Sequence, residues 1–203
     1  MMNKNKFKLI KIVLFFLIMS TKAYTDNYIK KNDMIVMGKE DAPIKIKIFS
    51  SLTCPHCANF HIKVIPKLKE KYVSKGTVQL IFIDFPLDQA AFNASKLLHC
   101  AEQKKQIKLL DDIYNNQNKW TSGNNINEIN NNLKNIAKIA GIDSSKFDKC
   151  VNDEKIADKI INGRIDGEKK YSISSTPTII INEKKLKGLA NFENIENRIK
   201  KLI

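Results

Sequence analysis

The stretch "FSSLTCPHCANF", residues 49–60, holds Cys54 and Cys57 separated by a proline and a histidine. It continues the run "APIKIKIFSS", residues 42–51, in which isoleucines alternate with lysines, a pattern typical of a β-strand with one apolar face. From Cys57 onward, apolar residues recur at helical spacing. We therefore predict that the cysteine pair lies at a strand-to-helix turn.

The segments that follow predict a second strand and then a long helical region. Pro66 is expected to kink or divide the first helix. The run "TVQLIFIDFPL", residues 77–87, is almost continuously apolar, which predicts a central strand buried on both faces. The order strand, helix, strand predicts parallel pairing. Residues 88–171 carry apolar stripes at helical spacing, linked by an Asn-rich stretch, residues 115–127.

The C-terminal part of the chain returns to strands. Gly141 and the candidate cap Ser144 divide the later helical region. We predict a strand at "SSTPTIII", residues 174–181, a short edge strand at "KLKG", residues 185–188, and a closing amphipathic helix over residues 192–202. The order βαβ, helices, ββα favours one α/β sheet unit with a helical insertion in its middle, and a length of 203 residues suits one domain of this kind.

The N-terminal segment, residues 1–23, has the pattern of a secretory signal. Four lysines precede an apolar run over residues 12–19, and that run is much shorter than the roughly 20 residues of a membrane-spanning helix. Thr21 and Ala23 are small residues at the positions that a signal peptidase requires, which predicts cleavage after Ala23. The alternative is an uncleaved anchor, which Lys22 favours.

The strong positive charge does not indicate nucleic-acid binding. The chain has a net charge of +14, and five of its 35 basic residues fall in the predicted signal, so the remainder keeps 30 basic against 21 acidic residues, or +9. These lysines are spread along the chain beside many Asn and Ile residues, whose codons are rich in A and T. No basic run interleaved with aromatic residues follows the pattern of a phosphate-binding surface.

Export also bears on the four cysteines, because thiols outside the cytosol tend to be oxidised. Two disulfides are then favoured, and of three connectivities only the pairs Cys54–Cys57 and Cys100–Cys150 keep the close pair together. Closing the short ring contributes about 2 kcal/mol and closing the long ring about 4 kcal/mol in the chain-entropy estimate. The short ring is therefore the exchangeable one, and the long ring would staple the helical insertion. The alternative for Cys100 and Cys150 is two free buried cysteines.

The position of the pair predicts redox chemistry. A helix N-terminus favours a negative sulfur at Cys54, and an imidazole at His56 adds to that effect. Cys57, one turn into the helix, would be the more buried partner that resolves or re-forms the bond. The main rival is a zinc or copper site, in which Cys54 and Cys57 would be joined by His61 and by His99 or His56. Only three histidines and no second C-x-x-C disfavour this rival.

The combination of strand, C-P-H-C, helix and a later T-P-T resembles the thioredoxin superfamily, and within it the DsbA-like thiol:disulfide oxidoreductases of bacterial envelopes. The resemblance covers residues 33–203, including "GKEDAP" before the first strand. It implies a thioredoxin-like fold with a helical domain inserted, at about residues 88–171, between the βαβ and ββα halves. The mature domain would span residues 24–203, after a signal peptide at residues 1–23.

The resemblance also implies roles for single residues. Cys54 would be the exposed nucleophile that forms the mixed disulfide, Cys57 its resolving partner, and Pro55 and His56 the dipeptide that tunes them. Thr176–Pro177 would be the cis-proline loop that faces the disulfide and offers backbone hydrogen bonds to an extended substrate. A trans proline at the start of a strand is the alternative for that loop.

Other positions match the family or depart from it. The Cys100–Cys150 bond resembles an extra structural disulfide found in some members. Many members carry a buried acid six residues before the first cysteine, where this chain has Ile48. Asp84, in the second strand, is a candidate for the proton handling that the missing acid would have performed.

Together these features predict a periplasmic oxidase that donates the Cys54–Cys57 disulfide to folding envelope or secreted proteins. Its partners would be reduced or unfolded exported proteins and a quinone-linked, DsbB-like membrane reoxidant, and the protein would be a monomer without metal, cofactor or nucleic acid. An isomerase is disfavoured because residues 24–39 are too short for a dimerisation domain. A reductase is disfavoured by Thr53, where such proteins commonly have tryptophan. A metal carrier would bind its ion without turnover, and a polypeptide-binding protein would keep full activity in Cys54→Ser.

Overall fold

The structure is a computed structural model that describes residues 34–203. The predicted signal peptide and its cleavage site lie outside the described residues. In the part of the chain from Met34 to the C-terminus, no helix is both long and apolar enough to cross a bilayer.

A five-stranded sheet forms the centre of the fold, with the strands in the order β1-β3-β2-β4-β5. The strands are β1 (Ile35–Met37), β2 (Ile44–Ser50), β3 (Val78–Asp84), β4 (Thr178–Ile181) and β5 (Lys184–Lys185). Strands β2 and β3 pair in parallel, which confirms the predicted pairing, and the other neighbours pair antiparallel. The register of β2 and β3 sets Ser50 opposite Asp84, at the edge where the cysteine turn begins.

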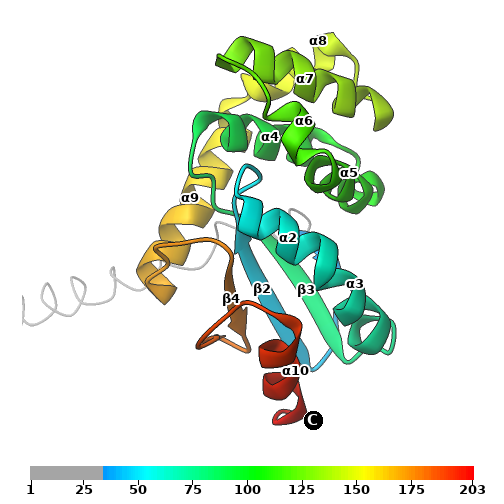
Figure 1. The fold of residues 1–203 in the computed structure, drawn as a ribbon, viewed down its shortest axis with the longest axis vertical. Coiled ribbons are helices and arrows are strands. Elements are labelled where there is room, and N and C mark those ends of the chain that lie inside the picture. Colours follow the sequence, from blue (N-terminus) through cyan, green and yellow to red (C-terminus); the bar gives the residue numbers. More distant parts are fainter. Residues whose placement is uncertain (1–33) are drawn as a thin grey trace, which may run out of the picture.

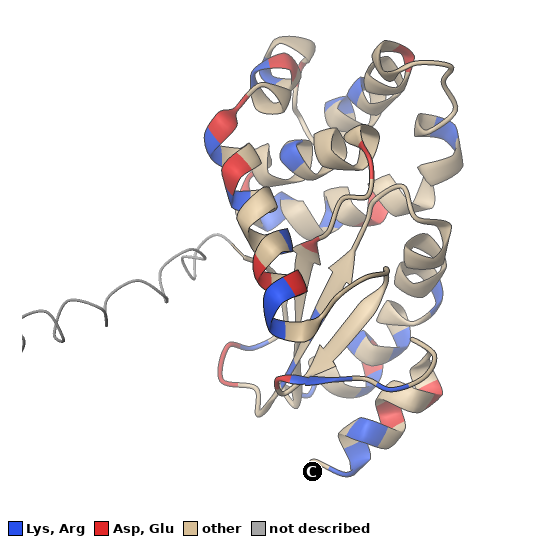
Figure 2. Ribbon diagram, turned by 90° about the vertical axis from the view of Figure 1, so that its left-hand side faces the viewer, with Lys and Arg blue, Asp and Glu red and all other residues tan. Residues whose placement is uncertain are grey.

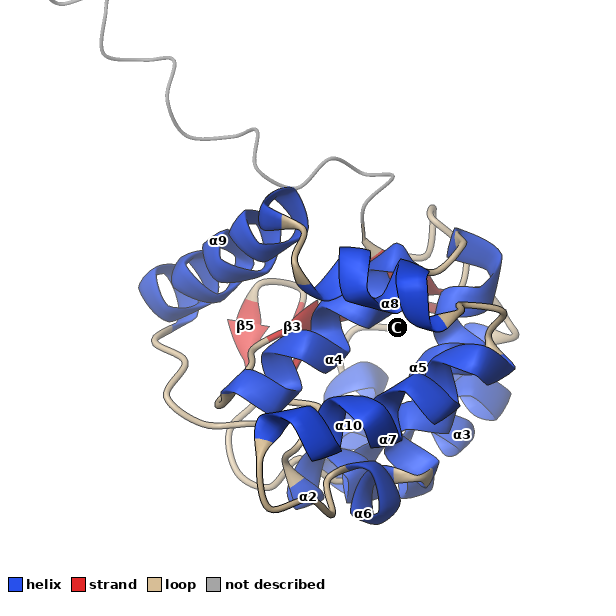
Figure 3. Ribbon diagram, turned by 90° about the horizontal axis from the view of Figure 1, so that it is seen from above, coloured by secondary structure: helices blue, strands red, loops and turns tan. Residues whose placement is uncertain are grey.

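Helices cover both faces of this sheet and extend beyond one end of it (Figure 1). They are α2 (Pro55–Lys63), α3 (Ile65–Leu68), the π-helical turn η3 (Lys69–Val73), α4 (Gln89–Cys100), α5 (Gln103–Asn115), α6 (Gln117–Trp120), α7 (Ile126–Ile139), α8 (Ser144–Val151), α9 (Glu154–Tyr171) and α10 (Phe192–Lys200). Helices α4 to α8 gather at the end of the sheet from which α2 starts, and α9 leads back along the opposite face (Figures 1 and 3). The α/β fold with a helical insertion is thus confirmed.

Three apolar clusters hold these parts together, and the smallest packs β2 and β4 against the segments that follow β3 and α9. On one face of the sheet, isoleucines of β2 and β4 pack against α2, α3 and α10 through residues such as Phe60, Leu68 and Ile195. The insertion has a core of its own, centred on Trp120 and Phe147, and this core reaches α2 at Cys57. The cysteine turn therefore lies where the core of the insertion meets the sheet unit.

Several local predictions need correction. Strand β1 was not predicted, because three residues in a polar segment carry no clear alternation. Strand β3 is an interior strand, as predicted, since β1 and β2 flank it, but only its first four residues are fully buried and β2 is the middle strand of the five. The edge strand lies at Lys184–Lys185, earlier than the predicted residues 185–188. Helix α8 is capped by Asp143, whose carboxylate accepts from the Lys146 N–H at 2.8 Å, and not by Ser144.

The break in the first helix and the distribution of charged residues agree with the sequence analysis. The first helix is divided near Pro66, with α2 ending at Lys63 and α3 beginning at Ile65. Basic and acidic positions are interspersed along α9 and the insertion, as Figure 2 shows for the ribbon turned to that side. This mixed distribution differs from the one-sided basic stripe that binds a phosphate backbone.

Candidate functional site

The cysteine pair sits at the start of α2. Cys54 is the N-cap residue, with extended backbone, and Pro55 occupies the first helical position, where its missing N–H costs nothing. The Cys54 carbonyl accepts from the Cys57 and Ala58 N–H groups, both at 3.1 Å. Cys54 is half-buried, whereas Cys57 is 1% exposed. Pro55 and His56 lie exposed on the surface beside Cys54.

The surroundings of Cys54 favour its thiolate. Burial alone would raise the pKa of this thiol. That effect is outweighed by the Thr176 hydroxyl and by the backbone N–H groups of Cys57 and His56, so the pKa of Cys54 lies below the ordinary value for cysteine. Backbone N–H groups at the start of α2 thus contribute to the lowered pKa of Cys54.

Cys57 has the opposite character. Burial, together with the nearby charge on Cys54, raises the pKa of the Cys57 thiol to about 12. When both sulfurs are reduced, Cys54 therefore loses its proton at a lower pH than Cys57 does. Because the thiolate is the nucleophile and the better leaving group, this asymmetry favours exchange at the half-exposed sulfur.

The loop before β4 comes up against this pair. The Thr176–Pro177 peptide bond is cis, and the Cys54 Sγ lies 3.5 Å from the Thr176 carbonyl oxygen. The Thr176 hydroxyl is buried and makes no full hydrogen bond with any residue that the structure describes, so it remains available to a sulfur anion. The structure thus brings Cys54, Cys57 and the Thr176–Pro177 loop together from segments far apart in the sequence.

Of the three histidines considered as metal ligands, His56 is exposed and the other two are paired with carboxylates. The His61 Nε2 pairs with the Asp111 carboxylate at 2.7 Å, and its ring lies 4.7 Å from the ring of Tyr114. The His99 Nε2 pairs with the Asp84 carboxylate, also at 2.7 Å. Among residues 34–203, no group of three or more His, Cys, Asp and Glu side chains is placed to hold a metal ion.

Asp84 is the centre of a buried polar cluster. Its carboxylate accepts from the Ser95 hydroxyl at 2.6 Å as well as from His99, and the His99 Nδ1 lies 3.4 Å from the Lys159 ammonium. Burial would raise the pKa of Asp84, but these partners, His99 first, bring it below the ordinary value. Asp84 therefore stays ionised inside the protein.

A small cavity separates Asp84 from Tyr114. It has a volume of about 10 Å³ and is also lined by Ser50, and such a volume is close to the least that holds one water molecule. The Tyr114 hydroxyl is buried without a hydrogen-bond partner among the described residues. Burial, followed by the charges on Cys57 and Asp84, raises the pKa of Tyr114 well above its ordinary value. Tyr114 is thus a neutral hydroxyl between the redox pair and the Asp84 cluster.

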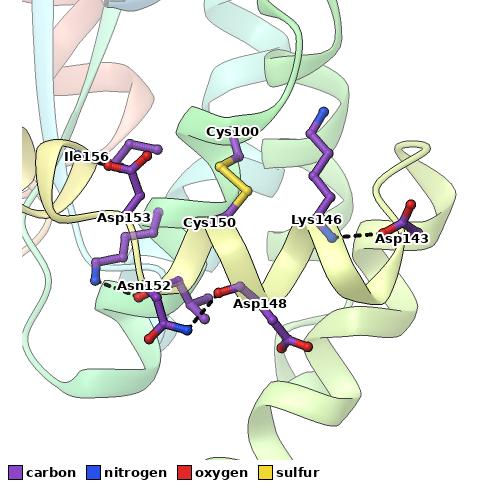
Figure 4. Close-up of a disulfide and its surroundings, with 10 residues drawn as sticks. Cys100, Asp143, Lys146, Asp148, Cys150, Asn152, Asp153 and Ile156 are labelled. Carbon is purple, nitrogen blue, oxygen red and sulfur yellow. Dashed lines mark hydrogen bonds between the residues drawn. A yellow bond between two sulfur atoms is a disulfide. The ribbon is translucent and has the colours of Figure 1, made fainter.

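The remaining two cysteines, Cys100 and Cys150, form a disulfide. Cys100, the last residue of α4, is bonded to Cys150 of α8, with the two Cα atoms 6.0 Å apart (Figure 4). The bond lies at the C-terminal end of α8, on the side of Asp153, which caps α9, whereas Asp143 caps α8 at its opposite end. It therefore joins the first helix of the insertion, α4, to α8.

Sequence reasoning missed two residues at the site, Tyr114 and Gln117. Both come from the insertion, from the end of α5 and the start of α6. Tyr114 follows the apolar stripe of an amphipathic helix and carries no motif. Gln117 lies in the Asn-rich stretch, which reads as a linker. Only the folded chain shows that Gln117 contacts the turn before Cys54.

Comparisons with known proteins agree on one family. The sequence profile described as Thioredoxin matches residues 30–201. A Bacillus anthracis protein named as disulfide bond formation protein D is 31% identical over 173 residues, which are 81% of this chain and 76% of that protein. The crystal structure of Wolbachia pipientis alpha-DsbA1 superposes with a TM-score of 0.75 and 31% identity, covering 86% of this chain and 92% of that chain.

A further relative is longer than this chain. A Rickettsia bellii protein named as a protein-disulfide oxidoreductase is 30% identical over 155 residues, which are 76% of this chain. The same alignment spans only 58% of the Rickettsia protein, so the chain covers little more than half of that relative.

Proposed function

Because the chain belongs to the DsbA-like thiol:disulfide oxidoreductases of the thioredoxin family, we propose that it oxidises the thiols of exported polypeptides with a Cys54–Cys57 disulfide. The observation that carries the proposal is the asymmetry of the pair. The Cys54 sulfur is half-exposed and has a lowered pKa, whereas the Cys57 sulfur is buried and has a pKa of about 12. A disulfide whose cleavage yields a stabilised thiolate is an oxidising one.

The reaction has two exchange steps. A substrate thiolate attacks the Cys54 Sγ, a bond forms between the two sulfurs, and the Cys54–Cys57 bond breaks with its electron pair going to Cys57. Cys57 then takes up a proton, as its high pKa requires. A second substrate thiolate attacks the first substrate sulfur, and Cys54 leaves as a thiolate. The substrate loses two electrons to form its disulfide, and the protein gains them as a dithiol.

The surroundings of the pair support roles for other residues. The Thr176–Pro177 loop beside Cys54 is suited to align an extended substrate strand through backbone hydrogen bonds. The exposed Pro55 and His56 would contact the same substrate and adjust the reactivity of Cys54. Cys100 and Cys150 would act only through the stability of the insertion.

The setting of the reaction is part of the proposal. Relatives named for disulfide bond formation support reduced, exported proteins as the substrates. We propose a periplasmic location, a monomer that needs neither metal nor cofactor, and reoxidation by a quinone-linked membrane protein. The signal pattern in residues 1–23 supports export.

The proposal is tested by mixing the oxidised protein with a reduced unfolded peptide that contains two cysteines. One molecule of protein should remove two thiols from the peptide and should gain two thiols itself. Alkylation followed by peptide mapping should place the new thiols at Cys54 and Cys57, while Cys100 and Cys150 stay bonded and serve as the internal control. The proposal fails if the peptide stays reduced or if the new thiols appear at the second pair.

Asp84→Asn provides a prediction on pH. The pKa of Asp84 is lowered in the folded protein, so its carboxylate stabilises the fold above the ordinary pKa, and the contribution is lost as the pH falls through the folded value. Removing the charge should lower the free energy of unfolding at neutral pH by about 2 kcal/mol, the size expected for hydrogen bonds to a charged group. Denaturant unfolding at several pH values should show the difference shrinking in acid, whereas the exposed Asp166→Asn should differ little from wild type at any pH.

The same variant tests a role in catalysis. We propose that Asp84, through Tyr114 and a water in the cavity between them, assists proton movement to and from Cys57 in place of the acid that Ile48 replaces. Asp84→Asn should then shift the pH profile of the exchange rate. An unchanged profile would leave Asp84 with a purely structural part.

A further inference from the structure

We infer that Gln117 of the helical insertion is a positioning residue for Cys54, holding the backbone of the active-site turn from outside the sheet unit. The inference rests on the proposed function, since it concerns how the reactive sulfur of that function is held. It assigns to the insertion a direct part in the redox chemistry.

The geometry of the contact is specific. Gln117 is 6% exposed, and its Nε2 donates to the Leu52 carbonyl at 2.8 Å and to the Cys54 carbonyl at 3.1 Å. A carboxamide nitrogen carries two hydrogens, so these two carbonyls use its full capacity as a donor. The Leu52 and Cys54 carbonyls lie on either side of Thr53. The Gln117 side chain therefore holds the backbone both before and after Thr53, immediately before α2 begins.

The held backbone determines what surrounds the Cys54 sulfur. As the N-cap, Cys54 directs its carbonyl at the Cys57 and Ala58 N–H groups. The N–H groups of His56 and Cys57 are among those that lower the pKa of Cys54. Their distance from the Cys54 Sγ depends on the torsion angles of Cys54. A donor that fixes the carbonyl of Cys54 consequently fixes how well its thiolate is stabilised.

Gln117 is itself rigidly placed. Trp120, one turn later in α6, is 1% exposed, and its indole N–H donates to the Ile113 carbonyl at 2.9 Å. The Thr121 hydroxyl donates to the carbonyl of Gln117 at 2.8 Å. Figures 1 and 3 both place α6 beside the start of α2. The buried core of the insertion thus holds Gln117 against the turn.

A second link from the insertion reaches the same turn. The Thr53 hydroxyl donates to the Asp88 carboxylate at 2.6 Å, and Asp88 also caps α4 by accepting from the Ala91 N–H. The turn is therefore held from the first helix of the insertion as well as from α6. Of the two links, only Gln117 contacts the carbonyl of Cys54 itself.

The test replaces Gln117 by methionine, which has a similar length and no donor. In the reduced full-length protein, the ionisation of Cys54 is followed by the ultraviolet absorbance of the thiolate and by the rate of reaction with iodoacetamide against pH. Gln117→Met should raise the pKa of Cys54. At a pH below the pKa, a rise of one unit in the pKa lowers the thiolate fraction tenfold. We expect Gln117→Met to lower the thiolate fraction of Cys54 about threefold. The reduction potential should become more negative in parallel.

Gln106→Met is the matched control, because Gln106 is also a buried glutamine of the insertion and lies on α5 about two turns before Tyr114. It should leave the titration of Cys54 as in wild type. If the Met variant fails to fold, Gln117→Asn decides, since its shorter side chain keeps an amide but withdraws it from the two carbonyls. A folded Gln117 variant with wild-type titration, or an equal shift in Gln106→Met, overturns the inference.

The titration does not depend on catalysis, so the two proposals fail separately. If wild-type protein transfers no disulfide but Gln117→Met still raises the pKa of Cys54, the positioning role stands and the proposed function fails. If wild-type protein oxidises the peptide and the Gln117 variants titrate as wild type, the proposed function stands and the positioning role fails.

Discussion

Cys54→Ser is expected to abolish disulfide transfer, and Cys57→Ser is expected to arrest the reaction as a mixed disulfide. The reason is the division of labour between the two sulfurs. The Cys54 sulfur is half-exposed and has a lowered pKa, so it can attack and be attacked, whereas Cys57 is buried and has a pKa of about 12. Without Cys57, nothing within the pair can release a substrate from Cys54.

Non-reducing electrophoresis and mass spectrometry of each variant after mixing with an oxidised two-cysteine peptide would check this. Cys57→Ser should accumulate a covalent adduct at Cys54 that reducing agent removes. Cys54→Ser should accumulate none, although it still has the Cys57 thiol. If Cys54→Ser instead acted on the peptide as fully as wild-type protein does, the protein would work by binding polypeptides and not by disulfide exchange.

Replacing both Cys100 and Cys150 by alanine is expected to lower the free energy of unfolding by about 4 kcal/mol, because the disulfide closes a loop between residues 50 positions apart. The cross-link restricts the unfolded chain over residues 100–150, more than half of the insertion, from the end of α4 to α8. Urea unfolding, with Cys54 and Cys57 kept reduced in both proteins, isolates this effect from the redox pair.

The control is a single-disulfide comparison at the other site. The free energy of unfolding of wild-type protein is measured with the Cys54–Cys57 bond formed and with it reduced. If the pair is an oxidant, these two values should differ by less than about 4 kcal/mol, the loss expected in the Cys100/Cys150 variant, since an oxidising bond stabilises its fold little or not at all. If the Cys100/Cys150 variant has the same free energy of unfolding as wild type, the disulfide adds no stability beyond the packing of α4 on α8.

The sequence could predict those features that local patterns encode. Alternating isoleucines and lysines predicted β2, and the C-P-H-C motif after that strand predicted the helix N-terminus that lowers the pKa of Cys54. The order of the segments predicted the insertion. Strand β1 was out of reach, because a three-residue edge strand is defined by its partner, Phe82 to Leu80 of β3, and not by its own composition.

The contacts across the insertion could not be predicted. Gln117 reaches Leu52 over 65 positions of sequence, and the choice of carbonyl depends on how α6 packs against the core. Asp84 was predicted as a candidate for proton handling at Cys57, but its pairing with His99 and Ser95 depends on how α4 packs at the end of β3. A buried polar side chain finds its partners only in the folded chain, because its neighbours come from separate elements.

The most direct test of the central claim is the redox equilibrium of the Cys54–Cys57 pair in glutathione buffers, measured by alkylation of the two cysteines. Stabilisation of the Cys54 thiolate predicts a reduction potential of roughly −200 mV or higher, in the range of dithiol oxidants. A pair that stays oxidised in reducing buffers, with a potential below about −300 mV as for structural disulfides, would contradict the claim that the Cys54–Cys57 disulfide is donated to substrates.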